Sequence, residues 1–212
     1  MGCDTIVRLR SMTKPIVAAC AMTLVEDCTL RLDDPVDDLL PELADMRVLA
    51  DPCGSLDDTV PAVRPLTLRD LLTFGIGIGT VLAEPGTVPI ADALIAIDRT
   101  DLDEWVRRLG ELPLVHQPGE RWMYGSAADA TGALIARATG RSLEEAVRER
   151  ICEPLGMKDR LQRGEWKSRP ARDVVHQGQR SHRRGVRRRP AGRAVQPAGD
   201  VRVRRCWPRL DR

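Results

Sequence analysis

Apolar side chains recur at helical spacing in several separate stretches of the first 159 residues. The earliest stretch runs from Ser11 to about Cys28 and has a proline, Pro15, in its first turn, where a missing N–H is tolerated. Its apolar positions are Ile16, Val17, Ala21, Leu24 and Val25. This spacing predicts a helix over residues 11–28.

Capping residues predict further helices along the same part of the chain. In each case an N-cap residue is followed three positions later by an acidic residue, as in a capping box. The pairs are Thr67 with Asp70, Asp101 with Glu104, and Ser142 with Glu145. Another helix is expected from about Ser126 to Ala138, because Gly140 is a natural left-handed cap. Only residues 5–9 look strand-like, so this segment is predicted to be mainly helical.

The charge distribution divides the chain near residue 160. Residues 1–159 carry 16 basic and 27 acidic side chains, whereas residues 160–212 carry 17 basic and 4 acidic side chains. The second segment also has few large apolar residues, so it cannot bury enough surface to offset the entropy of ordering it. We therefore expect a folded domain over 1–159 and an Arg-rich, disordered tail over 160–212.

Several classes of protein are disfavoured by the sequence. No apolar run approaches the roughly 18–20 residues of a membrane helix, so no membrane span is expected. The N-terminus has no basic segment followed by an apolar one, so no signal peptide is visible and a cytoplasmic location is expected. The six cysteines form no C-x-x-C pair and accompany no clustered histidines, so no metal site is expected.

Candidate chemistry is concentrated at Ser11 and Lys14, which are three residues apart at the start of the first predicted helix. Residues at this spacing share one helix face. A serine hydroxyl is a poor nucleophile until a neighbouring group takes its proton, and a lysine held beside it can be that group. The N-terminal end of a helix also favours developing negative charge. By itself, however, an S-x-x-K tetrapeptide more often marks only a solvated helix start.

The surroundings of this tetrapeptide resemble the β-lactamase-related serine hydrolases. This superfamily includes class C β-lactamases, penicillin-binding peptidases and class VIII carboxylesterases. The matching stretches occur in order over about residues 4–159. They are DTIVRLRSMTKP at 4–15, LRLDDPV at 30–36, LTLRDLL at 66–72, QPGERWMY at 117–124 and EPLGMKD at 153–159.

The resemblance implies an α+β, transpeptidase-like fold, of which this chain would contain mainly the helical part, with most of the antiparallel sheet missing. Ser11 would be the acylated nucleophile and Lys14 its proton partner. Tyr124 would be the tyrosine of the second motif and would relay a proton to or from the leaving group. Ser126, where an asparagine is commoner, would contact the substrate. The implied substrate is a small ester or amide, cleaved through an acyl-enzyme without a cofactor.

The chain departs from the family pattern at both ends. About two strands precede the nucleophile in the family, but Ser11 comes near the start here. In the family the third motif, Lys-Thr-Gly or His/Trp-x-Gly, lies far downstream of the tyrosine. Here its letters recur only at His176-Gln177-Gly178, which comes too soon after Tyr124 and lies beside an Arg-rich run. We therefore expect a truncated member with weak or no activity.

The composition after residue 160 is typical of a G+C-rich gene read out of frame, so a frameshift is a further expectation. If neither alternative reading frame past codon 160 encodes a strand-rich segment with the third motif, this expectation is wrong. Another class of function remains open, in which a non-catalytic fragment binds nucleic acid through the Arg-rich tail, since Arg pairs well with phosphate. No interleaved Phe or Tyr accompanies these arginines, so nonspecific rather than specific binding would be expected.

Overall fold

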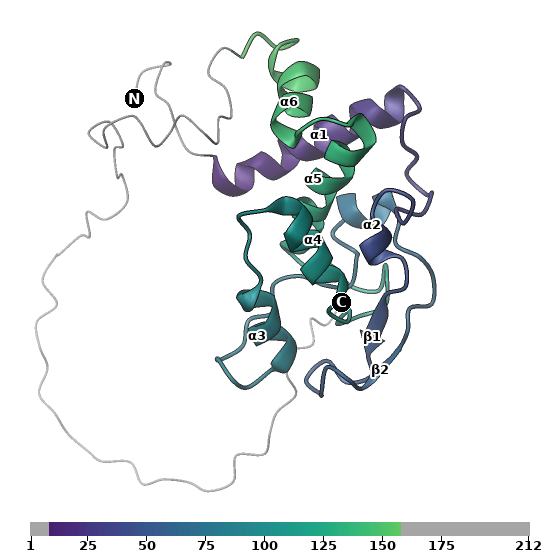
Figure 1. Ribbon diagram of the computed structural model, residues 1–212, viewed down its shortest axis with the longest axis vertical. Helices are drawn as coiled ribbons and strands as arrows, with labels where there is room; N and C mark the ends of the chain where they lie inside the picture. Colours follow the sequence, from purple (N-terminus) through teal and green to yellow (C-terminus); the bar gives the residue numbers. More distant parts are fainter. Residues whose placement is uncertain (1–8, 158–212) are drawn as a thin grey trace, which may run out of the picture. The chain divides into compact units, whose positions relative to one another are not determined.

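The computed structural model describes residues 9–157, and the elements in this range are mostly helical. A 3₁₀ turn, η1 (Arg10–Met12), leads into α1 (Thr13–Glu26), which Figure 1 draws in purple. The remaining helices are α2 (Leu68–Leu72), α3 (Pro89–Ala96), α4 (Leu102–Gly110), α5 (Ser126–Thr139) and α6 (Leu143–Val147). Short turns lie at η2 (Pro41–Leu43) and at η3 (Arg148–Cys152), a π-helical turn that continues α6. The mainly helical content expected from the sequence is confirmed.

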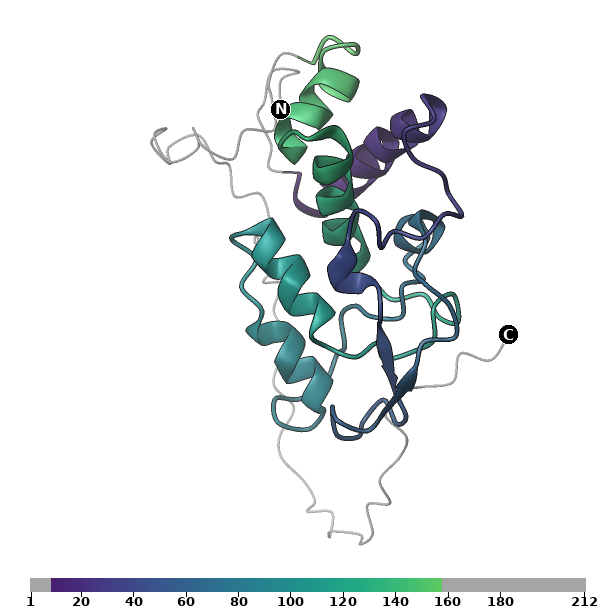
Figure 2. The same ribbon diagram turned by 45° about the vertical axis from the view of Figure 1, so that its right-hand side comes forward.

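Helix α5 is the central element of this region. It packs against α1, α2, α4 and α6, and its residues 130–135 are all buried. Figures 1 and 2 both place α1 and α6 beside its C-terminal part. Small residues such as Ala127, Ala130 and Ala133 let the neighbouring helices approach closely, while Leu134 and Ile135 fill the core between them.

Capping explains where several of these helices begin and end. Capping boxes at Thr67–Asp70 and Ser142–Glu145 open α2 and α6, as predicted. Asp101 caps α4 by accepting from the N–H groups of residues 103 and 104. Helix α5 ends at Gly140, whose φ of 63° lies in the left-handed region. Helix α3 was not expected, because its N-cap Val88 makes no side-chain hydrogen bond, although a proline at its first position is compatible with a helix start.

The described part of the chain contains one small sheet. Strand β1 (Arg47–Leu49) pairs with β2 (Thr59–Pro61) in an antiparallel register that places Val48 opposite Val60. Val48 also bridges Leu114 in parallel, which ties this hairpin to the segment before the second motif. Residues 5–9, the one stretch expected to form a strand, lie almost wholly outside the described range.

The glycine-rich run at residues 75–79 is buried. A Cβ on Gly77 would lie 2.1 Å from the carbonyl oxygen of His116, and one on Gly79 would lie 2.7 Å from that of Tyr124. Glycine is therefore required here by close backbone approach rather than by mobility. The run holds the backbone of the Tyr124 segment in place.

Two predictions concern residues outside the described range. The Arg-rich tail over 160–212 and the sequence His176-Gln177-Gly178 both lie there. Among residues 9–157, no helix is long and apolar enough to cross a membrane.

Candidate active site

Ser11 and Lys14 lie at the point where η1 passes into α1. The Lys14 Nζ donates a hydrogen bond of 3.4 Å to the Ser11 Oγ, as their spacing on one helix face predicts. Ser11 is exposed and Lys14 is half-buried. Arg10, directly before the serine, has a φ of 46°, a conformation that is costly for a residue with a Cβ. The chain therefore enters the site through a strained turn that presents the serine hydroxyl to solvent.

Tyr124 reaches the same place from a distant part of the sequence. The Lys14 Nζ lies 4.7 Å from the centroid of its ring. Hydrogen bonds from Ser11 and from Lys14 lower the pKa of the Tyr124 hydroxyl, because both favour its charged form. The structure thus brings together three of the residues selected from the sequence, with Lys14 in contact with both Ser11 and Tyr124.

An aromatic cluster surrounds Tyr124. Its ring lies 5.9 Å from that of Phe74 at an interplanar angle of 6°, and Trp122 lies 5.9 Å from each of the two. Phe74 has a φ of 61°, which is unusual for a bulky residue, and its carbonyl accepts from the N–H of Met123 at 2.9 Å. The Tyr124 carbonyl accepts from the N–H of Thr80 at 2.6 Å. These contacts fix the position of the tyrosine ring.

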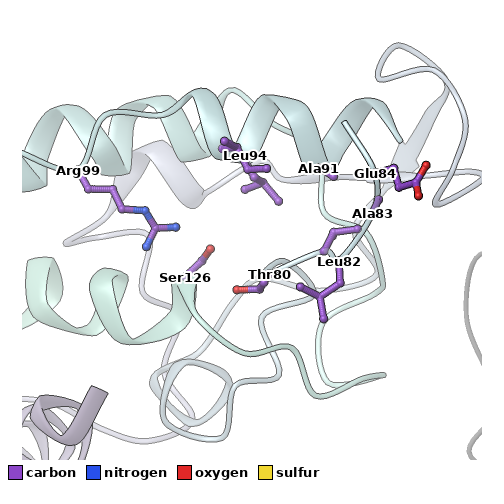
Figure 3. Close-up of a pocket in the computed structure, with 11 residues that line it drawn as sticks. Thr80, Leu82, Ala83, Glu84, Ala91, Leu94, Arg99 and Ser126 are labelled. Carbon is purple, nitrogen blue, oxygen red and sulfur yellow. The ribbon is translucent and has the colours of Figure 1, made fainter. Parts of the chain in front are cut away.

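Ser126, the fourth residue selected from the sequence, faces a different space. It is the first residue of α5, is only 2% exposed and lines a cavity of about 720 Å³. Figure 3 shows its hydroxyl directed toward the same space as Thr80 and the guanidinium of Arg99. The candidate site therefore consists of the cluster of Ser11, Lys14 and Tyr124 and an adjacent cavity, with Tyr124 and Ser126 two residues apart between them.

Sequence reasoning missed two residues of this site. Phe74 could have been noticed as the chain's single phenylalanine, but its stacking on Tyr124 depends on the tertiary fold. Arg99 follows α3 in the sequence and lines the cavity, a position that depends on the tertiary fold.

His116 is buried in the segment before Tyr124. Burial lowers its pKa, and the charge of Arg121 acts in the same direction. Among residues 9–157, no group of three or more His, Cys, Asp or Glu side chains could hold a metal ion. Asp33 forms an ion pair with Arg69.

Comparison with known proteins places the chain in a family. The family model described as Beta-lactamase matches residues 1–203. Protein Rv1367c of Mycobacterium tuberculosis is 39% identical over 156 residues, which cover 74% of this chain and 39% of that protein. Esterase EstB of Burkholderia gladioli is 40% identical over 161 residues, which cover 74% of this chain and 38% of the esterase. The chain thus spans little more than a third of the length of these relatives.

A solved structure shows the same fold. Simvastatin synthase (LovD) from Aspergillus terreus, unliganded, superimposes with a TM-score of 0.59 at 33% identity. The superposition covers 75% of this chain and 40% of the synthase. The β-lactamase/transpeptidase-like fold expected from the sequence is therefore confirmed, with a mostly helical described region and one two-stranded sheet.

Proposed function

Since the chain belongs to the Beta-lactamase family, we propose that Ser11, Lys14 and Tyr124 form the acyl-transfer centre of a serine hydrolase acting on small esters or amides. The observation that supports this most strongly is the contact of Lys14 with both partners, 3.4 Å from the Ser11 Oγ and 4.7 Å from the Tyr124 ring centroid. Residues more than 100 positions apart in the sequence thus meet in an arrangement suited to nucleophilic catalysis.

In the proposed reaction, the Ser11 Oγ attacks the substrate carbonyl carbon and its proton passes to the Tyr124 oxygen. The ammonium of Lys14 stabilises the phenolate that accepts this proton, and the lowered pKa of Tyr124 makes that form more accessible. As the tetrahedral intermediate collapses, the proton passes to the leaving alcohol or amine and Ser11 remains acylated. Water then attacks the acyl-enzyme, gives its proton to Tyr124 and releases the acid, and Ser11 regains its proton.

The relatives support an ester or amide as the substrate class. One of them is named an esterase, and the solved neighbour is named a synthase of simvastatin. Both hydrolysis and acyl transfer follow from one acyl-enzyme, since the acceptor can be water or an alcohol. For this chain the proposal is hydrolysis with slow turnover. The third motif, which would lie beside the oxyanion hole, has only a letter match at residues 176–178. Removal of one oxyanion-hole donor typically costs about 2.7–4 kcal/mol of barrier.

Hydrolysis of p-nitrophenyl acetate and butyrate by the full chain and by its Ser11→Ala variant tests this function. We expect nitrophenol release that is slow in the wild type and reduced to the buffer rate by Ser11→Ala. Ser55→Ala, which changes an exposed serine in a surface turn, is the matched control and should leave the rate unchanged. Equal rates for the wild type and Ser11→Ala would contradict the assignment, and rapid Ser11-dependent turnover would contradict the expectation of weak activity.

A further inference from the structure

The cavity next to the catalytic cluster has the size and lining of a ligand site. Its volume of about 720 Å³ lies within the range of roughly 300–1,000 Å³ that small-molecule sites occupy. One wall is the loop of residues 79–84, and the opposite wall is α3 with Ala91 and Leu94 (Figure 3). Ser126 forms part of the wall that leads back toward Tyr124.

The mouth of this cavity carries unusually exposed apolar side chains. Leu82 is 91% exposed and Ile95 is 75% exposed, and both line the cavity from opposite walls. Leu94 and Ala91 behind them are buried. Apolar residues gathered on both sides of a cavity are typical of a site that covers an apolar ligand.

Arg99 is the only cationic side chain among the described residues that line the cavity. Its guanidinium lies 5.9 Å from the ring centroid of the buried Trp105, and its Nη1 pairs with the Asp129 Oδ2 at 3.2 Å. Figure 3 shows this group directed toward the space beside Ser126, whereas the Glu84 carboxylate points away from it. A guanidinium has five N–H donors, so the bond to Asp129 leaves others able to reach a ligand.

The ion pair with Asp129 does not prevent the Arg99 guanidinium from binding a ligand. Both side chains are about half exposed, at 56% and 45%, and such surface pairs contribute little free energy. The cation–π contact with Trp105, at 5.9 Å, adds a second attraction that favours the observed position of the guanidinium. The N-terminal end of α5 adds further positive potential at Ser126.

We propose that this cavity binds the acyl chain of the substrate, and that Arg99 selects acyl chains that carry a carboxylate. The apolar body of the chain would lie between Leu82, Leu94 and Ile95, and its carboxylate would receive hydrogen bonds from Arg99. The proposal rests on the proposed hydrolase function and narrows its substrate class to amphiphilic, anionic esters. Arg99 is then a specificity-determining residue that takes no part in proton transfer.

Matched pairs of esters test the selection. The p-nitrophenyl monoesters of adipate and suberate carry a free carboxylate, and their ω-methyl esters have the same chain without the charge. We expect kcat/KM of the wild type to be about fivefold to tenfold higher for the anionic member of a pair. The ratio is modest because solvent screening weakens the charge-assisted hydrogen bond to the half-exposed Arg99. High salt should lower this preference.

Variants of Arg99 separate its role from a general charge effect. Arg99→Gln should abolish the preference between the two members of a pair, and Arg99→Lys should restore part of it. Arg141→Gln is the matched control, because Arg141 is equally exposed and ion-paired but lies outside the cavity lining. Equal kcat/KM for both members of a pair in the wild type, or a preference that survives Arg99→Gln, would overturn the proposal.

A binding measurement keeps the proposal testable if no ester is hydrolysed. Calorimetric titration of the Ser11→Ala protein should show tighter binding of octanoate than of octanamide, and Arg99→Gln should remove the difference. Equal affinities, or no binding of either compound, would refute the cavity's role. Loss of Ser11-dependent hydrolysis with retained octanoate selectivity would instead refute the proposed hydrolase function alone.

Discussion

Ser11 and Lys14 both lower the pKa of the Tyr124 hydroxyl, because each stabilises its phenolate form. An acid whose charged form gains partners has a lowered pKa, so the phenolate is populated at lower pH than in a free tyrosine. The pKa of Tyr124 therefore reports on the interaction of its hydroxyl with Ser11 and Lys14. It can be followed without any substrate.

We predict that the Tyr124 phenolate appears with a midpoint below the value of about 10 for an unperturbed tyrosine. The chain contains one tyrosine, so the near-ultraviolet absorbance of phenolate reports Tyr124 alone. In Lys14→Met and in Ser11→Ala the midpoint should rise, because each variant removes one hydrogen bond to the phenolate. A midpoint that is the same in all three proteins would show that these side chains do not interact in solution.

A second residue-scale prediction concerns Phe74, whose ring stacks on that of Tyr124. Phe74→Leu keeps an apolar side chain but removes the ring, and such aromatic pairs contribute about 0.5–1.5 kcal/mol beyond their buried area. Ser11-dependent hydrolysis should therefore fall by roughly twofold to tenfold, and the Tyr124 midpoint should change as the ring moves. Val63→Leu, at a position that is 74% exposed and away from the cluster, is the control. An unchanged rate in Phe74→Leu would remove Phe74 from the set of positioning residues.

At the scale of elements, the start of α2 depends on a single buried carboxylate. Asp70 is 5% exposed, closes the capping box with Thr67 and accepts two hydrogen bonds from Arg64, at 2.6 and 2.8 Å. Burial raises its pKa, but the bonds from Arg64 and Thr67 outweigh that effect and the pKa is lowered overall. Helix α2 in turn packs against α5 and precedes Phe74.

Asp70→Ala should lower the free energy of unfolding by about 2 kcal/mol, since it removes one half of the capping box and the hydrogen bonds that the buried carboxylate accepts from Arg64. Asp33→Ala breaks the exposed pair with Arg69 and should cost less than about 1 kcal/mol. Denaturant unfolding of the three proteins measures both values. Similar losses in the two variants would mean that burial of Asp70 contributes nothing to the stability of α2.

Sequence patterns predicted elements whose determinants are local. The capping boxes of α2 and α6, the Gly140 cap of α5 and the spacing of Ser11 and Lys14 can all be seen in the sequence. Helix α3, the β1–β2 hairpin and the stacking of Phe74 on Tyr124 could not be predicted, because each depends on partners distant in the sequence. The position of Tyr124 beside Ser11 came from the family resemblance rather than from spacing.

At the scale of the molecule, ion pairs between distant segments connect the helices around α5. Arg137 of α5 bonds both carboxylate oxygens of Glu42 at 2.8 Å and the Leu39 carbonyl at 3.0 Å. The hydrogen bonds from Arg137 lower the pKa of Glu42. Glu42 and Asp70 are therefore both carboxylates that the fold stabilises in their charged form.

This predicts acid lability of the fold. A carboxyl whose pKa is lower in the folded state than in the unfolded state stabilises the protein at any pH above its unfolded-state pKa, which is about 4 for Asp and Glu. This stabilisation is lost as the pH falls through the folded-state pKa. Thermal unfolding should therefore show a midpoint that is constant near neutral pH and decreases below about pH 4. The decrease should be smaller in a Glu42→Gln, Asp70→Asn double variant, and an equally steep decrease there would assign the acid lability to other groups.

The central claim is that Ser11 is the residue acylated by substrate, and covalent labelling tests it most directly. The full chain is treated with a fluorophosphonate and the modified peptide is identified by mass spectrometry. The account predicts one adduct on the peptide containing Ser11, absent in Ser11→Ala and retained in Ser55→Ala. An adduct on another residue, or labelling that persists in Ser11→Ala, would contradict it.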